Sequence, residues 1–230
     1  MDIRNRSNRG PEINPYLASK LISDLTLDEL VFLHLDDASY SRTVGPQVCR
    51  SSLSFLVEML SATFINVRTQ QYGPIFASFS ILDQVGGLYS LTSKETKYEA
   101  GIKRALDLFG GLCKKDLESL YSIRNGVFHD GSLVNIAKNG SHHVIFRMVR
   151  DSGKLLHHPE NQWGGSYDDS MTEHMIKIDL QELKKLVHTV LDNCREAFYG
   201  GDLYPQVTDK REFFYRYLFA TIPVKDEIFG

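Results

Sequence analysis

The segment Leu120-Tyr-Ser-Ile-Arg124-Asn125-Gly126-Val-Phe-His129-Asp130 places an arginine and a histidine five positions apart, late in an apolar segment. From Leu112 to Phe128 the apolar residues recur close to a helical period, which predicts a helix. Arg124 is four positions from both Leu120 and Phe128, so it shares the apolar side of that helix. A guanidinium there must meet an acceptor or reach a cavity, because burying it unpaired is costly.

Arg124 and His129 together supply the groups needed to cleave RNA without a metal ion. An arginine can hold a phosphate, and a histidine can move a proton near neutral pH. Five residues of a regular α-helix, however, turn by a net angle of about 140°, so the two side chains would not share a face. Either Asn125-Gly126 loosens the last turn, or the site is completed in another way, such as across a dimer. A structural arginine paired with a carboxylate is the alternative interpretation of Arg124.

A second arginine and histidine, Arg150 and His157, have a similar spacing. They flank Asp151-Ser152-Gly153, whose composition is typical of a turn. This context favours Arg124 and His129 as the functional pair.

The run Arg124-Asn125-Gly126-Val127-Phe128-His129 resembles the motif of the HEPN family of small helical domains. That motif is an arginine, often followed by a polar residue such as Asn, then a histidine after four to six residues, late in a helix. The resemblance extends over the helix order of residues 50 to 130. It implies a helical fold and, for many members, metal-independent endoribonuclease activity in toxin–antitoxin, phage-defence or RNA-processing systems. Other members keep the fold and serve as binding or dimerisation modules.

Asp83 is a third candidate residue, on a helix predicted from Pro74 to Ser90. It lies at the edge of the apolar side, four positions after Phe79 and three before Gly86. In a bundle it could fix the Arg124 guanidinium or favour a charged imidazole at His129. Gly86-Gly87 would let a neighbouring helix approach closely. The alternative for Asp83 is a structural salt bridge, and the resemblance favours the functional role because HEPN nucleases often carry a polar residue on the equivalent helix.

The patterns predict a mainly α fold, an antiparallel helical bundle with a small β-hairpin insertion. The bundle comprises helices at 48–68, 74–90, 97–109 and 112–128. The insertion, at about 140–178, has a strand at 142–149 pairing with 154–157, and a third strand at 175–178. Asp179 would cap a further helix that continues to about Tyr199. Residues 1–45 are interpreted as an N-terminal arm and helix, and residues 46–230 as the HEPN-like domain.

Composition favours a globular cytoplasmic protein. Hydrophobic residues make up 42% and charged residues 24%, and the chain has neither a long apolar run nor an apolar signal-like N-terminus. The three cysteines lack zinc-site spacing and are expected to be buried reduced thiols. A net charge of −3 argues against a large nucleic-acid surface, which an enzyme holding one or two nucleotides does not need.

A cluster of histidines around the predicted hairpin raises the alternative of a zinc site. The cluster comprises His142, His143, His157, His158 and His174, with Asp168 and Asp169 nearby. Adjacent strand residues face opposite sides, so solvated histidines are the preferred interpretation. Signatures of phosphate loops, serine hydrolases and zinc proteases are absent. We therefore expect no cofactor and no metal.

The leading hypothesis is a metal-independent endoribonuclease that produces a 2′,3′-cyclic phosphate. His129 would act as general base or acid, Arg124 would stabilise the phosphoryl charge, Asn125 would position the phosphate or His129, and Asp83 would support them. The expected partners are an RNA substrate, a second copy in a homodimer with a composite active site, and an antitoxin or regulatory protein. The alternative is a non-catalytic HEPN-like module for dimerisation or for binding RNA or a nucleotide.

Overall fold

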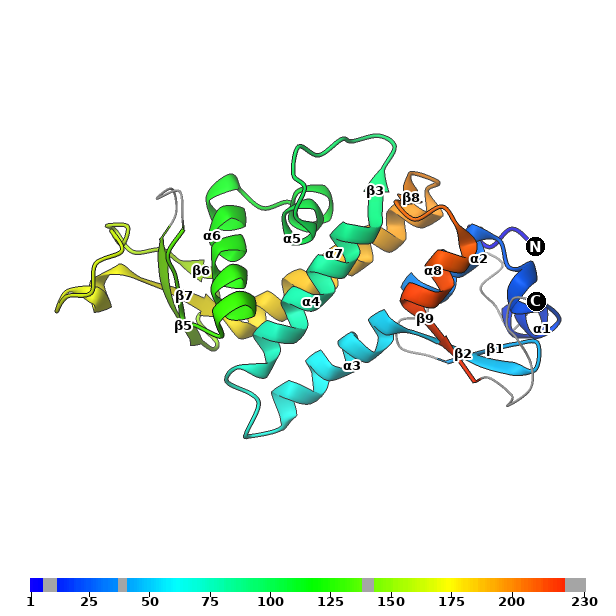
Figure 1. The fold of residues 1–230 in the computed structure, drawn as a ribbon, viewed down its shortest axis with the longest axis horizontal. Helices are drawn as coiled ribbons and strands as arrows, with labels where there is room; N and C mark the ends of the chain where they lie inside the picture. The colour runs from blue at the N-terminus through cyan, green and yellow to red at the C-terminus, as the bar shows by residue number, and fades with distance from the viewer. Residues whose placement is uncertain (6–11, 37–40, 138–142, 222–230) are drawn as a thin grey trace. The chain divides into compact units, whose positions relative to one another are not determined.

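The computed structural model describes residues 1–5, 12–36, 41–137 and 143–221 (Figure 1). The chain divides into two compact units that interleave along the sequence. The first unit comprises Met1–Met59, Leu88–Glu95 and Leu191–Gly230, and the second comprises Leu60–Gly87 and Thr96–Val190. All four predicted site residues fall in the second unit.

The helices of the second unit carry the predicted motif. They are the end of α3 (Ser52–Ile65), most of α4 (Gly73–Leu88), α5 (Gly101–Ala105), α6 (Lys114–Asn125) and the first half of α7 (Leu180–Tyr199). Two of them continue into π-helical turns, α5 into η3 (Leu106–Gly110) and α6 into η4 (Gly126–Asp130). The spacing of apolar residues therefore located these helices, but not the wider turns that end two of them.

A sheet with strand order β4-β5-β7-β6 packs on α6 in the second unit (Figure 1). Its strands are β4 (Val134–Asn135), β5 (Val144–Val149), β6 (Leu156–His157) and β7 (Met175–Asp179), and a short 3₁₀ turn, η5 (Met171–His174), precedes β7. The Asn135 side chain donates a hydrogen bond to Ser122 Oγ of α6 at 2.7 Å. Asp179 Oδ1 accepts from the backbone N–H groups of Gln181 and Glu182, so it caps α7 as predicted.

The first unit combines short helices with two small sheets. Besides the beginning of α3 and the end of α7, its helices are α1 (Ile13–Ala18), the 3₁₀ turn η2 (Ile22–Asp24), α2 (Leu27–Leu35) and α8 (Lys210–Tyr217). One sheet has the order β1-β2-β9, formed by Arg42–Val44, Gln47–Ser51 and Leu218–Ala220; the other pairs β3 (Tyr89–Leu91) with β8 (Leu203–Pro205). Thr26 begins α2 with a capping box that includes Glu29.

The predicted fold class, a mainly α antiparallel bundle with one hairpin, is wrong. The described residues are 52% helical and 16% strand, in three sheets. The missed strands are two to five residues long, and several of them pair with distant segments, as in Cys49↔Ala220. The local spacing of apolar residues carries little information about such pairs. Residues 48–51 fit the apolar spacing of a helix, but they belong to β2, and the helix α3 begins only at Ser52.

The predicted pairing of 142–149 with 154–157 is also wrong. The strand β5 pairs in parallel with β7, and β6 pairs with the other edge of β7 in the antiparallel sense. The Asp151-Ser152-Gly153 turn therefore does not join neighbouring strands. His142, the first residue of that predicted strand, lies outside the described residues.

Two further expectations concern the cysteines and membranes. Cys49 and Cys194 are buried free thiols, as predicted, whereas Cys113 is exposed. Burial raises the pKa of the Cys49 thiol to about 11. None of the helices in the described ranges has the length and apolar character needed to cross a bilayer.

Candidate active site

Arg124, near the end of α6, forms an ion pair with Asp83 of α4. The Nε of Arg124 donates to Asp83 Oδ2 at 2.8 Å, and both side chains keep about a quarter of their surface exposed, 23% and 24%. The guanidinium is therefore neither unpaired nor fully desolvated. The ion pair between Asp83 and Arg124, which was one of the two roles expected for Asp83, is therefore present.

His129 lies beside Arg124 because the helix widens after Asn125. The residues Gly126–Asp130 form a π-helical turn, in which hydrogen bonds join residues five apart. Residues five apart then come close to the same side of the helix, instead of diverging by about 140°. As a result, Arg124 Nη1 lies 3.3 Å from His129 Nε2. A loosened last helical turn was one of the two arrangements that the sequence allowed for bringing Arg124 and His129 together, and this structure has it.

Gly126 permits this turn because the chain folds back against it. A Cβ atom at Gly126 would lie 2.8 Å from the carbonyl oxygen of Val134. The π turn ends at Gly131, whose φ of 60° is the left-handed conformation that glycine adopts readily. The spacing of the two site residues thus depends on glycines at both ends of the turn.

The guanidinium keeps donors for a ligand. Its Nη1 also lies 3.3 Å from Asn125 Oδ1, so Arg124 contacts all three of the other predicted site residues. Among the described residues, Arg124 Nη2 has no acceptor within hydrogen-bond distance. A planar fork with free N–H groups matches a phosphate.

The contact between Arg124 and His129 can be a hydrogen bond in one direction only. A guanidinium only donates hydrogen bonds, so His129 Nε2 must be unprotonated to accept one. That neutral form is also the one that can take up a proton. The His129 side chain is exposed, so substrate can reach it.

Asp83 has a second, structural contact. Its Oδ1 accepts from the backbone N–H of Ile102 at 2.9 Å, at the start of α5. The approach is close: a Cβ at Gly86 would lie 1.9 Å from the carbonyl oxygen of Gly101. The prediction that this glycine pair admits a neighbouring helix is confirmed for Gly86, whereas Gly87 faces no atom within 4 Å.

A row of aromatic rings beside Arg124 was not predicted as part of the site. The guanidinium lies 5.1 Å from the centre of the Phe128 ring. The Phe128 ring is tilted against that of Phe76, with ring centres 5.5 Å apart, and the Phe76 ring centre lies 5.2 Å from that of Tyr72. Phe128 is 37% exposed, so part of its ring faces solvent beside the guanidinium. The sequence signal was the helical spacing of these residues, which equally describes a buried core.

The structure does not bring the second arginine and histidine together. Arg150 donates to Gln70, while His157 lies on β6, which β7 separates from β5.

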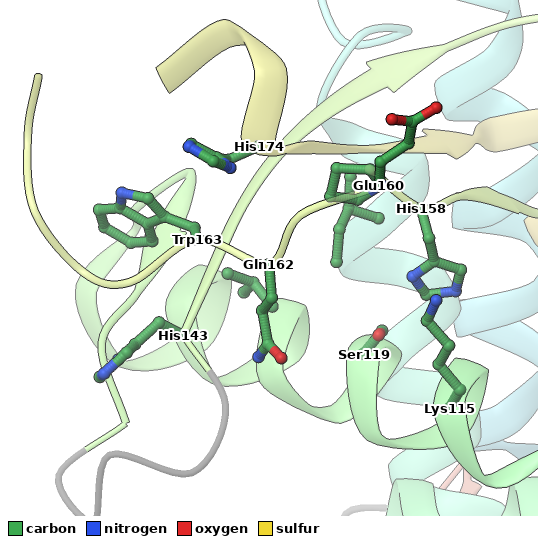
Figure 2. A pocket seen from close by; sticks show the side chains of 11 residues that line it. Lys115, Ser119, His143, His158, Glu160, Gln162, Trp163 and His174 are labelled. Atoms are coloured by element: carbon green, nitrogen blue, oxygen red, sulfur yellow. The ribbon is translucent and has the colours of Figure 1, made fainter. Parts of the chain in front are cut away.

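The histidines of the predicted hairpin divide between different places. His143, His158 and His174 line one cavity together with Trp163 (Figure 2), and His157 is not among its lining residues. Within the described ranges, no three His, Cys, Asp or Glu side chains are grouped as metal ligands. The interpretation of these histidines as merely solvated misses the cavity, because it forms from segments far apart in sequence.

Comparison with known proteins gives no match to a protein-family model, a curated protein or a solved structure.

Proposed function

We propose that this protein is a metal-independent endoribonuclease of the HEPN type. The observation that carries the proposal is the contact of Arg124 Nη1 with His129 Nε2 at 3.3 Å, beside an Nη2 that has no acceptor in the described part of the chain. A phosphate donor set and a proton acceptor thus lie within reach of one phosphodiester. We further infer a cytoplasmic location, where RNA substrates occur.

The reaction uses the RNA's own 2′-hydroxyl as nucleophile. The 2′-oxygen bonds to the adjacent phosphorus and loses its proton to His129 Nε2, while the bond from phosphorus to the 5′-oxygen breaks. Arg124 holds the phosphoryl oxygens as charge builds on them, and Asn125 contributes a further polar contact. Asp83 keeps the guanidinium in place through Nε. The products are a 2′,3′-cyclic phosphate and a 5′-hydroxyl.

The leaving 5′-oxygen needs a proton, which one imidazole in a fixed place does not readily supply. A two-fold homodimer solves this by bringing a second, protonated His129 to the same cleft. The exposed Phe128 ring next to the motif gives such an interface an apolar contact. An antitoxin or regulatory protein acting in toxin–antitoxin or antiviral defence would control the enzyme by covering this surface.

Single-turnover cleavage of RNA by variants tests the assignment. We expect His129→Ala and Arg124→Ala each to lower the rate about 10²–10⁴-fold, the usual contribution of a general acid or base or of a transition-state donor. His157→Ala and Arg216→Ala are matched controls, since Arg216 is likewise paired with a carboxylate, that of Glu212. Equal losses in the controls, or full activity in both site variants, would overturn the assignment.

A non-catalytic HEPN-like module for dimerisation or for RNA or nucleotide binding is the second candidate. The observation that favours it is the double use of Asp83, which holds both Arg124 and the first turn of α5. In that case Arg124 is a structural residue. Wild-type protein that folds, dimerises and binds RNA without cleaving any substrate offered would support this candidate.

A further inference from the structure

A cavity of about 220 Å³ lies between α6, the start of β5 and the segment that follows β6 (Figure 2). Its polar lining comes from Lys115, Ser119, His143, His158, Glu160, Gln162 and His174, and the largely buried Trp163 forms part of the wall. None of the four candidate catalytic residues lines it. It is therefore separate from the candidate catalytic residues.

The two ends of the cavity differ in chemistry. Figure 2 shows Lys115 pointing toward His158 at one end, and Trp163 with His174 and His143 at the other. Lys115 is exposed and has no carboxylate partner among the described residues. One end thus presents a free ammonium group, and the other presents aromatic rings.

The rings are held in place by neighbouring groups. Trp163 is only 4% exposed, and its Nε1 donates to the carbonyl oxygen of Ser166 at 2.7 Å. His143 Nδ1 accepts from the backbone N–H of Ala137 at 3.1 Å, which leaves Nε2 as the protonated nitrogen for a ligand. His158 Nε2 bonds to Asp116 Oδ1 at 2.6 Å. A lining fixed in this way loses little conformational entropy when a ligand enters.

The size of the cavity limits the ligand. About 220 Å³ corresponds to roughly seven waters at about 30 Å³ each, and lies below the roughly 300–1,000 Å³ of drug-sized sites. One planar heterocycle fits, with the rest of the ligand at the open rim. Proteins recognise unstacked bases with aromatic rings and side-chain hydrogen bonds, and lysine binds phosphate as a point charge.

We propose that this cavity binds a single ribonucleotide, with the base among Trp163, His143 and Gln162 and the phosphate at the Lys115 ammonium group. The site is distinct from the candidate catalytic centre. Lys115 precedes Arg124 by nine residues, which on an α-helix is about two and a half turns and roughly 13.5 Å. The two side chains therefore leave α6 on opposite sides. The nucleotide is either a free molecule or one nucleotide of an RNA strand.

Trp163 is the sole tryptophan of the chain, so its fluorescence reports on the cavity directly. The titration uses the full chain carrying His129→Ala, which prevents cleavage, with AMP, GMP, CMP, UMP and short single-stranded RNA as probes. We expect a saturable change in the Trp163 signal. Adding Lys115→Glu should weaken binding about tenfold or more, as expected for loss of a charged contact. Lys114→Glu, an exposed lysine that does not line the cavity, is the matched control and should bind unchanged.

The probes distinguish the two sources of the nucleotide. Binding of a mononucleotide that depends on Lys115 supports the site and assigns it to a free nucleotide. Binding of RNA alone, with the same dependence on Lys115, supports the site and assigns it to the strand. No saturable change with any probe, or equal loss with Lys115→Glu and Lys114→Glu, overturns the proposal. Because the readout is binding by a variant that cannot cleave, the result is independent of the proposed ribonuclease activity.

Discussion

Arg124 and Asp83 show how one side-chain pair combines stability with a role in the site. Asp83 Oδ1 accepts from the Ile102 N–H group and Oδ2 accepts from the guanidinium, so only the second contact pairs two opposite charges. Because both side chains are about a quarter exposed, the ion pair itself contributes about 1 kcal/mol or less. The backbone contact at Ile102 is therefore the main structural function of Asp83.

Substitutions at Asp83 separate these two functions. We expect Asp83→Asn to keep the Ile102 contact and the fold but to slow RNA cleavage, because the guanidinium loses its charged partner. Asp83→Ala should slow cleavage and also lower the free energy of unfolding by about 1–3 kcal/mol, since the Ile102 N–H group loses its acceptor. Urea unfolding with single-turnover cleavage checks both. Equal stability of the two variants would contradict the role given to Oδ1.

Glu29 gives the stability of the first unit a predictable dependence on pH. The residue is 2% exposed; burial alone would raise its pKa, but hydrogen bonds from Lys20, Tyr16 and the Thr26 N–H group lower it below the usual 4.5. A carboxyl with a lowered folded-state pKa stabilises the fold above its unfolded pKa, and this contribution is lost as pH falls through the folded pKa.

Glu29→Gln should therefore destabilise the protein at pH 7, and the difference from wild type should shrink as the pH is lowered below 4.5. Urea unfolding at pH 7, 5 and 3.5 measures this trend. A difference that stays constant over the series would show that the Glu29 charge is not what stabilises the cluster.

At the scale of elements, the close approach of α4 and α5 depends on one glycine of a pair. A Cβ at Gly86 would lie 1.9 Å from a backbone oxygen of α5, whereas Gly87 meets nothing within 4 Å. We expect Gly86→Ala to lower the free energy of unfolding by about 1–3 kcal/mol or more through overpacking. Gly87→Ala, the matched control, should be neutral or more stable, because alanine favours helix by about 1 kcal/mol. Thermal unfolding compares the two, and similar destabilisation by both would contradict the packing described.

The π turn η4 links the fold to the spacing of the site. Gly126→Ala would place Cβ 2.8 Å from the Val134 carbonyl oxygen, so the turn or the following strand must shift. We expect cleavage to fall more than stability, because the contact between Arg124 and His129 depends on that turn. A circular dichroism melt beside the cleavage assay makes the comparison. Unchanged cleavage in a folded Gly126→Ala protein would show that the turn does not set the site geometry.

The sequence predicted the elements whose signal is local. The helical period located α4, α6 and α7, and Asp179 marked the start of α7 by its capping chemistry. It did not predict β2 with β9 or β3 with β8, since these pairs join segments more than a hundred residues apart. From the sequence, contacts of Arg124 with Asp83 and with His129 were two of several possible arrangements. A π turn has no clear sequence signature beyond Asn125-Gly126, so the sequence could not decide between these arrangements.

At the scale of the whole molecule, the proposed chemistry requires two copies of the chain. Light scattering should give a mass near twice the 26.2 kDa of one chain. Replacing the exposed Phe128 with Glu should weaken the dimer and reduce cleavage together, since a charge would enter the apolar contact. A monomeric wild-type protein with full activity would contradict the composite site.

The chemical ends of the RNA products test the proposed activity most directly. Wild-type protein, incubated with single-stranded RNA in EDTA, should leave 2′,3′-cyclic phosphate and 5′-hydroxyl ends, and a substrate lacking the 2′-hydroxyl at the cleaved position should stay intact. Cleavage that requires a divalent metal, leaves 5′-phosphate ends or proceeds without the 2′-hydroxyl would contradict a mechanism based on Arg124 and His129.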